Sequence, residues 1–315
     1  MSKSSHTSPD YRIAVVGSGA VGCYYGGRLA QQGREVHFLM RSDFDQVKAH
    51  GLQILSPEGN ARITEVHCHR TTEDIGPCDL VIIALKSTSN GSLLDLIPPL
   101  LKADTMLLTL QNGLGNEEFL AEHFGGHRVL GGLCFVCINR TAPGVIQHIA
   151  QGQISMGEFG GSPQARTQAV AGEFRQCGVP CEVAESLAEA RWRKLVWNIP
   201  FNGLSIVGGC IDTETILGSA PLEALVLALM KEIIETARKL GHQLPEGLAE
   251  DMIARTKTMA RYKTSSLIDF VEGREVEVEP IWGEPLRRAA DQGLAMPKLE
   301  VLYQLISHAV DARTP

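Results

Sequence analysis

The chain has 315 residues, of which 44% are hydrophobic and 21% are charged, and its formal net charge is −7. This length predicts two domains, because a single compact core stops growing at about 250–300 residues. The acidic balance argues against a nucleic-acid partner, and no apolar run approaches the ~20 residues of a membrane helix, so we expect neither nucleic acid nor membrane as a partner.

The first ten residues, MSKSSHTSPD, are polar and lack the apolar segment of a secretory signal, so we interpret residues 1–10 as a disordered leader. Eight cysteines in a chain of this length are typical of reduced, cytoplasmic thiols. Cys134 and Cys137 form a C-x-x-C in a predicted strand, where positions three apart face opposite sides. The HCH run at 67–69 alternates in the same way. We therefore expect no metal site.

A strand, a helix and a second strand are predicted within residues 12–41. Residues 13–16 form a short β-branched apolar run, which is typical of a buried parallel strand. The helix is predicted over 20–32 and the second strand over 35–40. Between the first strand and the helix stands GSGAVG, residues 17–22, in G-x-G-x-x-G spacing. In this context the spacing is the fingerprint of a dinucleotide-binding turn.

Each glycine of this turn has its own reason to be a glycine. Gly17 permits the tight turn, Gly19 lets a pyrophosphate approach the backbone, and Gly22 lets the helix pack against the strand. The first N–H groups of the helix and the positive end of its dipole would hold the phosphates. The alternative is a glycine-rich turn in another kind of α/β protein. The cofactor-binding residues predicted here are Gly17, Ser18, Gly19, Ala20, Val21 and Gly22.

Arg41 indicates which dinucleotide binds. An NAD-binding protein usually carries Asp or Glu at the tip of the second strand, where the carboxylate binds the 2′-hydroxyl of the ribose. This chain has Arg41 and Ser42 there, and a guanidinium suits the 2′-phosphate of NADP. The alternative is an ordinary solvated arginine. The predicted cofactor is therefore NADP, as NADPH, rather than NAD.

Strands and helices continue to alternate up to about residue 185. Further strands are predicted over 51–55, 62–69, 79–85, 105–110, 129–138, 144–149, 152–156 and 181–183, and helices over 92–101 and 165–177. The strands on either side of Ala150-Gln151 are expected to face each other. This alternation predicts an α/β fold for residues 11–185, in the form of a Rossmann-type, doubly wound parallel sheet with antiparallel additions.

Beyond residue 185 the strand signals stop and helical patterns dominate. Helices are predicted over 186–204, 222–240, 246–261, 285–292 and 298–310. In the second of these, apolar residues recur at three- and four-residue spacing and form one stripe. Residues 186–315 are therefore predicted to form an all-α domain, whose surface could supply the face of a homodimer.

Two polar residues stand where predicted strands end. Lys86 follows DLVIIAL, and Asn112 follows TMLLTL. Ligands of open α/β sheets bind outside the carboxyl ends of the strands, where a lysine can meet a cofactor phosphate or a substrate carboxylate. An asparagine there can bond the nicotinamide ribose or the substrate. The alternatives are a solvated lysine and a turn-forming Asn before Gly.

The first helix of the second domain carries a polar stripe. Lys194, Asn198 and Asn202 are spaced i, i+4, i+8 in apolar surroundings, so they line one face. Two amides and an ammonium on a core-facing stripe are costly unless a ligand or partner satisfies them. The alternative is a solvated polar face. Further on, 264–266 and the acidic run 275–279 supply hydroxyls and carboxylates, or only a helix cap and a solvated edge.

From about Arg12 to its C-terminus the chain resembles the ketopantoate reductase (2-dehydropantoate 2-reductase) family. The motifs that carry this resemblance, in family order, are GSGAVG at 17–22, LK at 85–86, QNG at 111–113, WRKLVWN-x-x-x-N at 192–202 and SSLIDFVEGREVEVE at 265–279. The resemblance implies a Rossmann domain, a helical domain and an active site in the cleft between them. It implies NADPH-dependent reduction of a small 2-oxo acid, 2-dehydropantoate, to (R)-pantoate.

The resemblance also implies a role for each matching residue. Lys194 would be the general acid, with Glu277 supporting it. Asn112, Asn198, Asn202 and Ser265 would hold the substrate, and Asn112 and Glu277 would also contact the cofactor. Arg41 would bind the 2′-phosphate, and Lys86 would lie near cofactor or substrate.

Two positions depart from the family pattern. The family often reads E-I-D-x-I-N-G from the glutamate onward, whereas this chain has Trp282 in place of the Asn, and Val276 where Thr is common. We expect both to lie near the substrate, which leaves open which 2-oxo acid is reduced. One alternative is a reductase of another 2-oxo acid. Another is a non-catalytic NADP-binding sensor, although a sensor would not need Lys194 as a proton donor.

Overall fold

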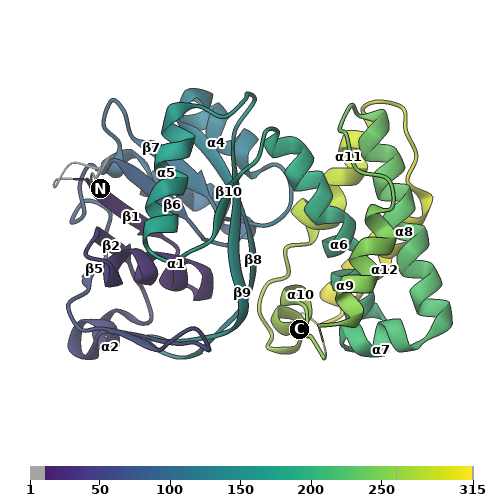
Figure 1. The fold of residues 1–315 in the computed structure, drawn as a ribbon, viewed down its shortest axis with the longest axis horizontal. Coiled ribbons are helices and arrows are strands. Elements are labelled where there is room, and N and C mark those ends of the chain that lie inside the picture. The colour runs from purple at the N-terminus through teal and green to yellow at the C-terminus, as the bar shows by residue number, and fades with distance from the viewer. Residues whose placement is uncertain (1–10, 260, 314–315) are drawn as a thin grey trace, which may run out of the picture. The chain divides into compact units, whose positions relative to one another are not determined.

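A computed structural model describes residues 11–259 and 261–313, and these fall into two compact units (Figure 1). The N-terminal unit comprises the described residues up to Gln111 together with Asn116–Leu187. The helical unit comprises Asn112–Gly115 and the described residues from Ala188 onward. The leader predicted over residues 1–10 lies outside the described residues. The division thus falls close to residue 185, but a short piece of the first half belongs with the second.

The N-terminal unit is built on one sheet, which has ten strands in the described residues. Along its main path the order is β4-β3-β9-β8-β7-β6-β1-β2-β5, and β10 pairs with β9. The strands are β1 (Arg12–Val16), β2 (Glu35–Leu39), β3 (Leu52–Leu55), β4 (Ala61–Ile63), β5 (His67–His69), β6 (Leu80–Ile83), β7 (Met106–Thr109), β8 (Val129–Ala142), β9 (Val145–Glu158) and β10 (Cys181–Val183).

From β8 to β5 every neighbouring pair on this path is parallel, whereas β9 runs antiparallel to β8 and β4 runs antiparallel to β3. The predicted fold class, a doubly wound parallel sheet with antiparallel additions, is therefore confirmed.

Helices cover both faces of this sheet. Ile13 and Val15 of β1 join one apolar core, with side chains of α1 (Ala20–Gln31) and α5 (Ala165–Gln176). Ala14 and Val16 join a second core, with α3 (Leu93–Leu96) and α4 (Asn116–Phe124). Successive strand residues point to opposite faces, so a stretch buried on both sides must be apolar throughout, as residues 13–16 of β1 are. The other helical segments of this unit are α2 (Phe44–His50), η1 (Ser87–Ser92), η2 (Pro98–Leu100) and η3 (Gly126–Arg128).

Two strand predictions were wrong in ways that have physical causes. Residues 62–69 belong to two strands, β4 and β5, which lie at opposite ends of the sheet path. The predicted strands over 144–149 and 152–156 are one strand, β9, which pairs along β8. Gln151 and Gly152 have φ of 65° and 129° and produce a bulge, where the pairing register shifts. Turns and bulges use the same residue types, so the two cannot be told apart from composition.

The helix predicted over 92–101 was also wrong in extent. Only the four residues of α3 are α-helical, and η1 precedes them. The expected break at Pro98 and Pro99 is present, because these prolines cannot continue the backbone hydrogen bonding and begin the 3-10 turn η2. Two helices of this unit, α2 and α4, were not predicted. Both are short and polar, so their apolar periodicity is weak.

The helical unit is all-helical over its described residues, as predicted. Its helices are α6 (Leu187–Val207), α7 (Thr213–Gly218), α8 (Ala220–Lys239), α9 (Leu248–Lys257), α10 (Ser265–Val271), α11 (Glu284–Ala290), α12 (Pro297–Asp311) and a π-helical turn η4 (Glu279–Gly283). The apolar stripe of α8 is buried in a core that also holds Trp192 and Trp282. The short helices α7 and α10 were not predicted.

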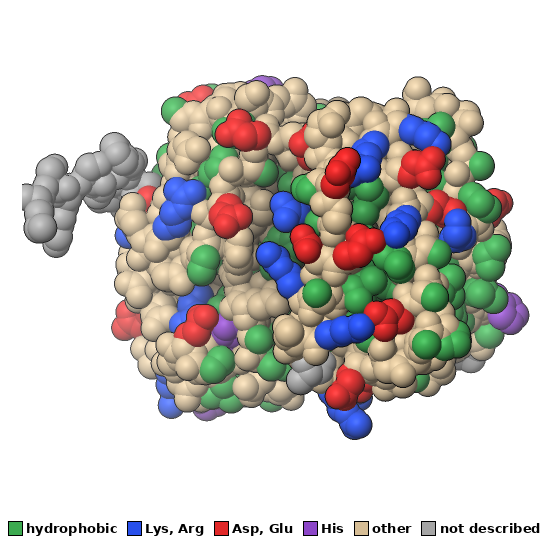
Figure 2. Space-filling model, turned by 45° about the vertical axis from the view of Figure 1, so that its right-hand side comes forward, with side chains coloured by type: hydrophobic (Ala, Val, Ile, Leu, Met, Phe, Trp, Pro, Cys, Tyr) green, Lys and Arg blue, Asp and Glu red, His purple; other side chains and the backbone are tan. Residues whose placement is uncertain are grey.

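The surface of the helical unit carries exposed ion pairs such as Lys257–Glu223 and Lys231–Glu250. On the face shown in Figure 2, acidic and basic side chains are interspersed with apolar ones. Exposed pairs of this kind contribute little to stability. None of the described helices combines the length and the apolar character needed to cross a membrane.

Candidate active site

The glycine-rich turn after β1 uses its three glycines for two different reasons. A Cβ on Gly17, where φ is +107°, would lie 2.3 Å from the Leu85 backbone nitrogen, and a Cβ on Gly22 would lie 2.1 Å from the Gly17 carbonyl oxygen. The fold itself therefore requires both glycines. A Cβ on Gly19 would meet no protein atom within 4 Å. Its position beside open space fits the pyrophosphate of a dinucleotide, which must approach the backbone closely.

The N-terminus of α1 is suited to an anion. Gly19 is the N-cap, no side chain caps the helix, and the first turn contains no acidic residue. Ala20 and Val21 are the first residues of the helix, so their N–H groups lie at the positive end of its dipole. The Ser18 hydroxyl donates to the Leu39 carbonyl at 2.6 Å and ties the turn to the end of β2.

Arg41 lies two residues beyond β2, with an exposed side chain. Within residues 11–259 and 261–313, its guanidinium donates no hydrogen bond and forms no ion pair. The next acidic residue, Asp43, is 4% exposed and accepts hydrogen bonds from Arg140 Nη1 at 2.8 Å and from the Gly144 N–H at 3.0 Å. The carboxylate nearest to the end of β2 is thus held inside the unit, whereas the guanidinium faces solvent.

Lys86 occupies the predicted place after the buried strand β6. It is the N-cap residue of η1, with extended backbone geometry, and its side chain is half-buried. The strand end and the following turn thus place a cation at the carboxyl end of the parallel sheet, where ligands of such sheets bind.

The structure brings Lys194 and Asn112 together. Lys194 Nζ, on α6, donates a hydrogen bond of 2.8 Å to Asn112 Oδ1, although the two residues are 82 apart in sequence. Lys194 is only 9% exposed. A buried ammonium is costly unless hydrogen bonds or charges satisfy it, so this contact is a built feature of the helical unit.

The segment that carries Asn112 is fastened to the π-helical turn η4. The Leu114 N–H donates to the Pro280 carbonyl at 2.9 Å. Gly113 has φ of +82°, and a Cβ there would lie 2.4 Å from the Pro280 carbonyl oxygen. Glycine is required at 113 on both counts, because neither the conformation nor the space admits a side chain.

Asn202 connects α6 to the start of α10. It is 1% exposed, and its Nδ2 donates to the Asn198 carbonyl at 2.9 Å. Its Oδ1 accepts from the Ser266 N–H at 3.0 Å and from the Ser265 hydroxyl at 3.5 Å. Three of its four hydrogen-bonding positions are therefore used inside the protein, which favours a supporting role for Asn202. Direct contact of Asn202 with a substrate stays a prediction.

Two hydroxyl side chains at the start of α10 have different roles: one caps the helix, and the other is a candidate for binding the substrate. Thr264 is fully buried and caps the helix, accepting from the Leu267 N–H at 3.4 Å. Ser265 is exposed. Asn198, one turn along α6 from Lys194, is 8% exposed. Ser265 and Asn198 thus remain candidates for binding the substrate, whereas the capping alternative holds for Thr264.

The acidic run before η4 contains one buried carboxylate. Glu277 is 9% exposed, whereas the Glu275 side chain lies at the surface and the Glu279 side chain is 55% exposed. Glu279 accepts from Tyr303 at 2.6 Å and pairs with Arg287. Burial therefore distinguishes Glu277 from the other two carboxylates of this run.

The two residues that depart from the family pattern lie in the core of the helical unit. Trp282 is fully buried, and its Nε1 donates to the Ile199 carbonyl of α6 at 3.0 Å. Val276 is 5% exposed and belongs to the same apolar cluster. Both side chains therefore pack inside the helical unit, and the expectation that they lie near the substrate stays a prediction.

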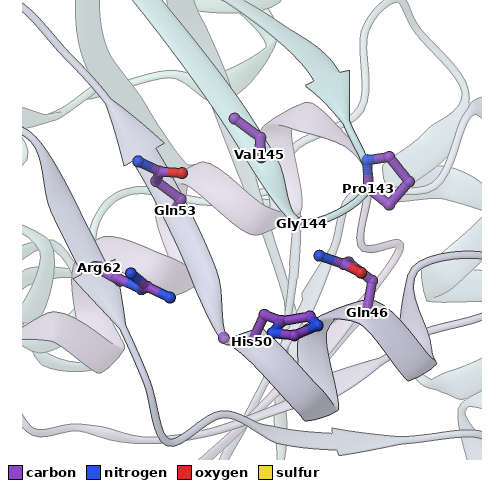
Figure 3. Close-up of a pocket in the computed structure, with 8 residues that line it drawn as sticks. Gln46, His50, Gln53, Arg62, Pro143, Gly144 and Val145 are labelled. Carbon is purple, nitrogen blue, oxygen red and sulfur yellow. The ribbon is translucent and has the colours of Figure 1, made fainter.

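An open pocket of about 300 Å³ lies elsewhere in the N-terminal unit, at α2, β3, β4 and the turn between β8 and β9 (Figure 3). Its polar side chains, Gln46, His50, Gln53 and Arg62, are all exposed. None of the predicted site residues lines it. In the described residues no group of three or more His, Cys, Asp or Glu could hold a metal ion.

Sequence reasoning missed residues that act through others. Asp43 and Arg140 form an ion pair behind Arg41, and Asn90 bonds both Gln111 and Asn116. These contacts span between 21 and 97 residues, so no local spacing signals them.

Two family models together match most of the chain. A family model described as "Ketopantoate reductase PanE/ApbA" matches residues 13–161, and one described as "Ketopantoate reductase PanE/ApbA C terminal" matches residues 186–310. The chain is 39% identical over 297 residues to a 2-dehydropantoate 2-reductase of Nostoc sp., covering 93% of each protein.

Solved structures give the same result. The crystal structure of a 2-dehydropantoate 2-reductase from Geobacter metallireducens has a TM-score of 0.92 and 43% identity, covering 95% of this chain and 99% of that one. A 2-dehydropantoate 2-reductase from Methylococcus capsulatus has a TM-score of 0.89 and 34% identity, covering 96% of this chain and 98% of that one.

Proposed function

The chain belongs to the ketopantoate reductase family, a family of oxidoreductases, and on that premise we propose that it reduces 2-dehydropantoate to (R)-pantoate with NADPH. The observation that carries this proposal is the buried ammonium of Lys194, held at 2.8 Å by Asn112 Oδ1. The reduction of a ketone needs a cationic acid in a fixed position, because the ketone oxygen gains negative charge when hydride adds to the ketone carbon.

In this mechanism Lys194 acts twice. NADPH, when bound, supplies the hydride that goes to the ketone carbon. Lys194 Nζ polarises the ketone oxygen and then gives it a proton, so that the hydroxyl of the product forms. Asn112 accepts one N–H of the ammonium and thereby directs the others. Glu277, buried in the same unit, would keep Lys194 protonated, because a nearby carboxylate favours the charged form of an amine.

The described residues fit NADPH better than NADH. The open space at Gly19 and the uncapped start of α1 would hold the pyrophosphate. Arg41 would bind the 2′-phosphate with its exposed guanidinium, as a charge-assisted contact. Asp43, the nearest acidic residue, is held by Arg140 and Gly144 and so is poorly placed to bind a ribose hydroxyl. Lys86 would contribute a further cation near cofactor or substrate.

Ser265 and Asn198 would bind the 2-oxo acid, with Asn202 holding Ser265 in place. The buried contact between Lys194 and Asn112 speaks against a sensor without catalysis, since binding a nucleotide alone does not need a proton donor.

Steady-state assays test this proposal directly. Loss of NADPH absorbance would be followed with 2-dehydropantoate and with a panel of other 2-oxo acids, each also with NADH. We expect the highest kcat/KM for 2-dehydropantoate with NADPH. A higher kcat/KM for another 2-oxo acid would show that 2-dehydropantoate is not the preferred substrate. An equal kcat/KM with NADH would show that Arg41 does not select NADPH.

We also place the protein in the cytoplasm. In the described residues the eight cysteines are all free, and five of them are buried, which supports a reducing compartment. A homodimer formed through the helical half stays a prediction, which light scattering in solution would check.

A further inference from the structure

Four residues of the chain, Asn112–Gly115, belong to the helical unit although both of their neighbours belong to the N-terminal unit. Within this segment Asn112 bonds Lys194, and Leu114 is 5% exposed in the core of the helical unit. The segment thus carries a side-chain contact of the proposed proton donor, and its geometry depends on how its two ends are fixed.

Both ends are held by the same side chain. Asn90 Oδ1 accepts a hydrogen bond of 2.7 Å from Gln111 Nε2, at the first end of the segment. Asn90 Nδ2 donates a hydrogen bond of 3.0 Å to Asn116 Oδ1, at the other end. One amide therefore bridges residues 111 and 116, using its acceptor for one and its donor for the other.

These contacts lie in a buried polar chain. Gln111 and Asn116 are 4% and 1% exposed, and Asn90 is half-buried. The chain continues to the fully buried Thr109, whose hydroxyl donates to Gln111 Oε1 at 2.9 Å. Buried polar networks are rigid when they are satisfied, and losing one member removes a hydrogen bond from each of its partners.

The segment itself has little intrinsic rigidity. Gly113 and Gly115 have φ of +82° and +91°, and glycine has the largest backbone freedom of any residue. Two glycines in four residues would sample many conformations if their ends were free. The bridge at Asn90 removes that freedom from the base of the segment.

We propose that Asn90 is a positioning residue for the proton donor: it fixes both ends of the segment that presents Asn112 to Lys194. This proposal rests on the proposed function for its catalytic consequence, but not for its structural one. Asn90 acts through Gln111 and Asn116, the two side chains that it bonds.

The structural consequence is tested by hydrogen exchange of the full-length protein. Asn90→Ala should speed amide exchange in peptides covering 109–118, by about tenfold if one buried hydrogen bond at each end is lost. Ser92→Ala is the matched control, because it removes a hydrogen bond to Ser89 from the same short helix without touching Gln111 or Asn116. Unchanged exchange in Asn90→Ala, or equal acceleration in Ser92→Ala, overturns the proposal.

The catalytic consequence is tested by a double-mutant cycle on kcat. Asn90→Ala should lower kcat about tenfold, with the Kd for NADPH changed less than about twofold. If Asn90 acts through Asn112, it should have little further effect in an Asn112→Ala background. Additive losses, or a loss of NADPH binding that accounts for the lower rate, overturn the positioning role.

Hydrogen exchange and kcat together distinguish a failure of the proposed function from a failure of the role proposed for Asn90. A wild-type protein that reduces no 2-oxo acid would refute the proposed function, while the exchange result would still decide what Asn90 holds. A wild-type enzyme that is active, with Asn90→Ala unchanged in both kcat and exchange, would refute the present inference alone.

Discussion

The glycine-rich turn at 17–22 and the contact between Lys194 and Asn112 are two functional features built in opposite ways. The turn is local: six consecutive residues make it, from the end of β1 into the first turn of α1, and its spacing is visible in the sequence. The contact joins residues 82 apart and depends on a segment fastened to Pro280. A local feature can be lost by one substitution in place, whereas a remote one can also be lost through residues that never touch it.

The largest effect is expected at the remote contact. Lys194→Ala should lower kcat by roughly 10²–10⁴, the usual contribution of a positioned acid or base. The Kd for NADPH should stay close to that of the wild type, since the proposed cofactor contacts belong to the glycine-rich turn and Arg41. Lys257→Ala, which removes an exposed lysine of the same unit, is the control and should leave kcat unchanged.

The turn itself separates binding from folding. Gly19→Val should abolish NADPH binding with little loss of stability, because its side chain would enter the open space in which we propose that the pyrophosphate binds. Gly22→Ala should do the reverse and lower the free energy of unfolding, by about 1–3 kcal/mol for overpacking, since its Cβ would lie 2.1 Å from the Gly17 carbonyl. Fluorescence titration and urea unfolding measure the two quantities. Equal effects of both variants on both quantities would contradict this division.

Arg41, just beyond the end of β2, tests which cofactor the N-terminal unit prefers. Arg41→Asp should raise the KM for NADPH by about 10- to 100-fold, because a hydrogen bond to a charged group contributes ~1.5–3 kcal/mol. The preference for NADPH over NADH should narrow. Arg62→Asp, at an exposed arginine of the same unit that lines the open pocket, is the control. A similar rise in KM for both variants would show only a loss of general charge.

A smaller effect is expected at the start of α10, in the helical unit. Ser265→Ala should raise the KM for the 2-oxo acid several-fold, by about 0.5–1.5 kcal/mol for one hydrogen bond, and leave the Kd for NADPH alone. Thr264→Ala should instead lower stability by about 1 kcal/mol through loss of the helix cap, with less effect on KM. A loss of stability without a change in KM for Ser265→Ala would make Ser265 a structural residue.

The smallest effect is expected on the pH dependence of stability, at a contact between two histidines that has no proposed function. His37 Nδ1 lies 3.0 Å from His69 Nε2, and burial, with the neighbouring positive charges, lowers the pKa of both imidazoles. The unfolded chain therefore binds protons at higher pH than the folded one, so stability should fall as the pH drops through about 6.5 and below.

His69→Gln should make that fall shallower, by well under about 1 kcal/mol because solvent screens this partly exposed group. Urea unfolding at pH 7.5 and pH 5.5 compares the two proteins. An unchanged slope would show that His69 does not titrate differently on folding.

The sequence was sufficient for features that repeat over short distances. Gly17, Gly22 and the apolar strand at 13–16 are required by local geometry, so spacing alone predicted the turn and both flanking elements. The stripe Lys194, Asn198, Asn202 followed from helical periodicity. The family resemblance added Glu277 and Ser265, whose surroundings no local pattern describes.

The rest depended on contacts that chain order does not encode. The bulge at Gln151 and Gly152 has the composition of a turn, so one long strand was taken for two. Trp282 lies five residues after the buried Glu277, and its indole lies in the core and donates to the Ile199 carbonyl. Asn90 had no signal at all, because its partners at 111 and 116 come near it only when the sheet is formed.

The pH dependence of kcat, measured with 2-dehydropantoate and NADPH in the wild type and in Lys194→Ala, tests the central claim most directly. If Lys194 is the proton donor, wild-type turnover should decline at high pH as the ammonium loses its proton, and the residual activity of Lys194→Ala should show no such alkaline limb. Near-normal turnover in Lys194→Ala, or an alkaline limb that persists in it, would make Lys194 a structural lysine and assign the proton to another group.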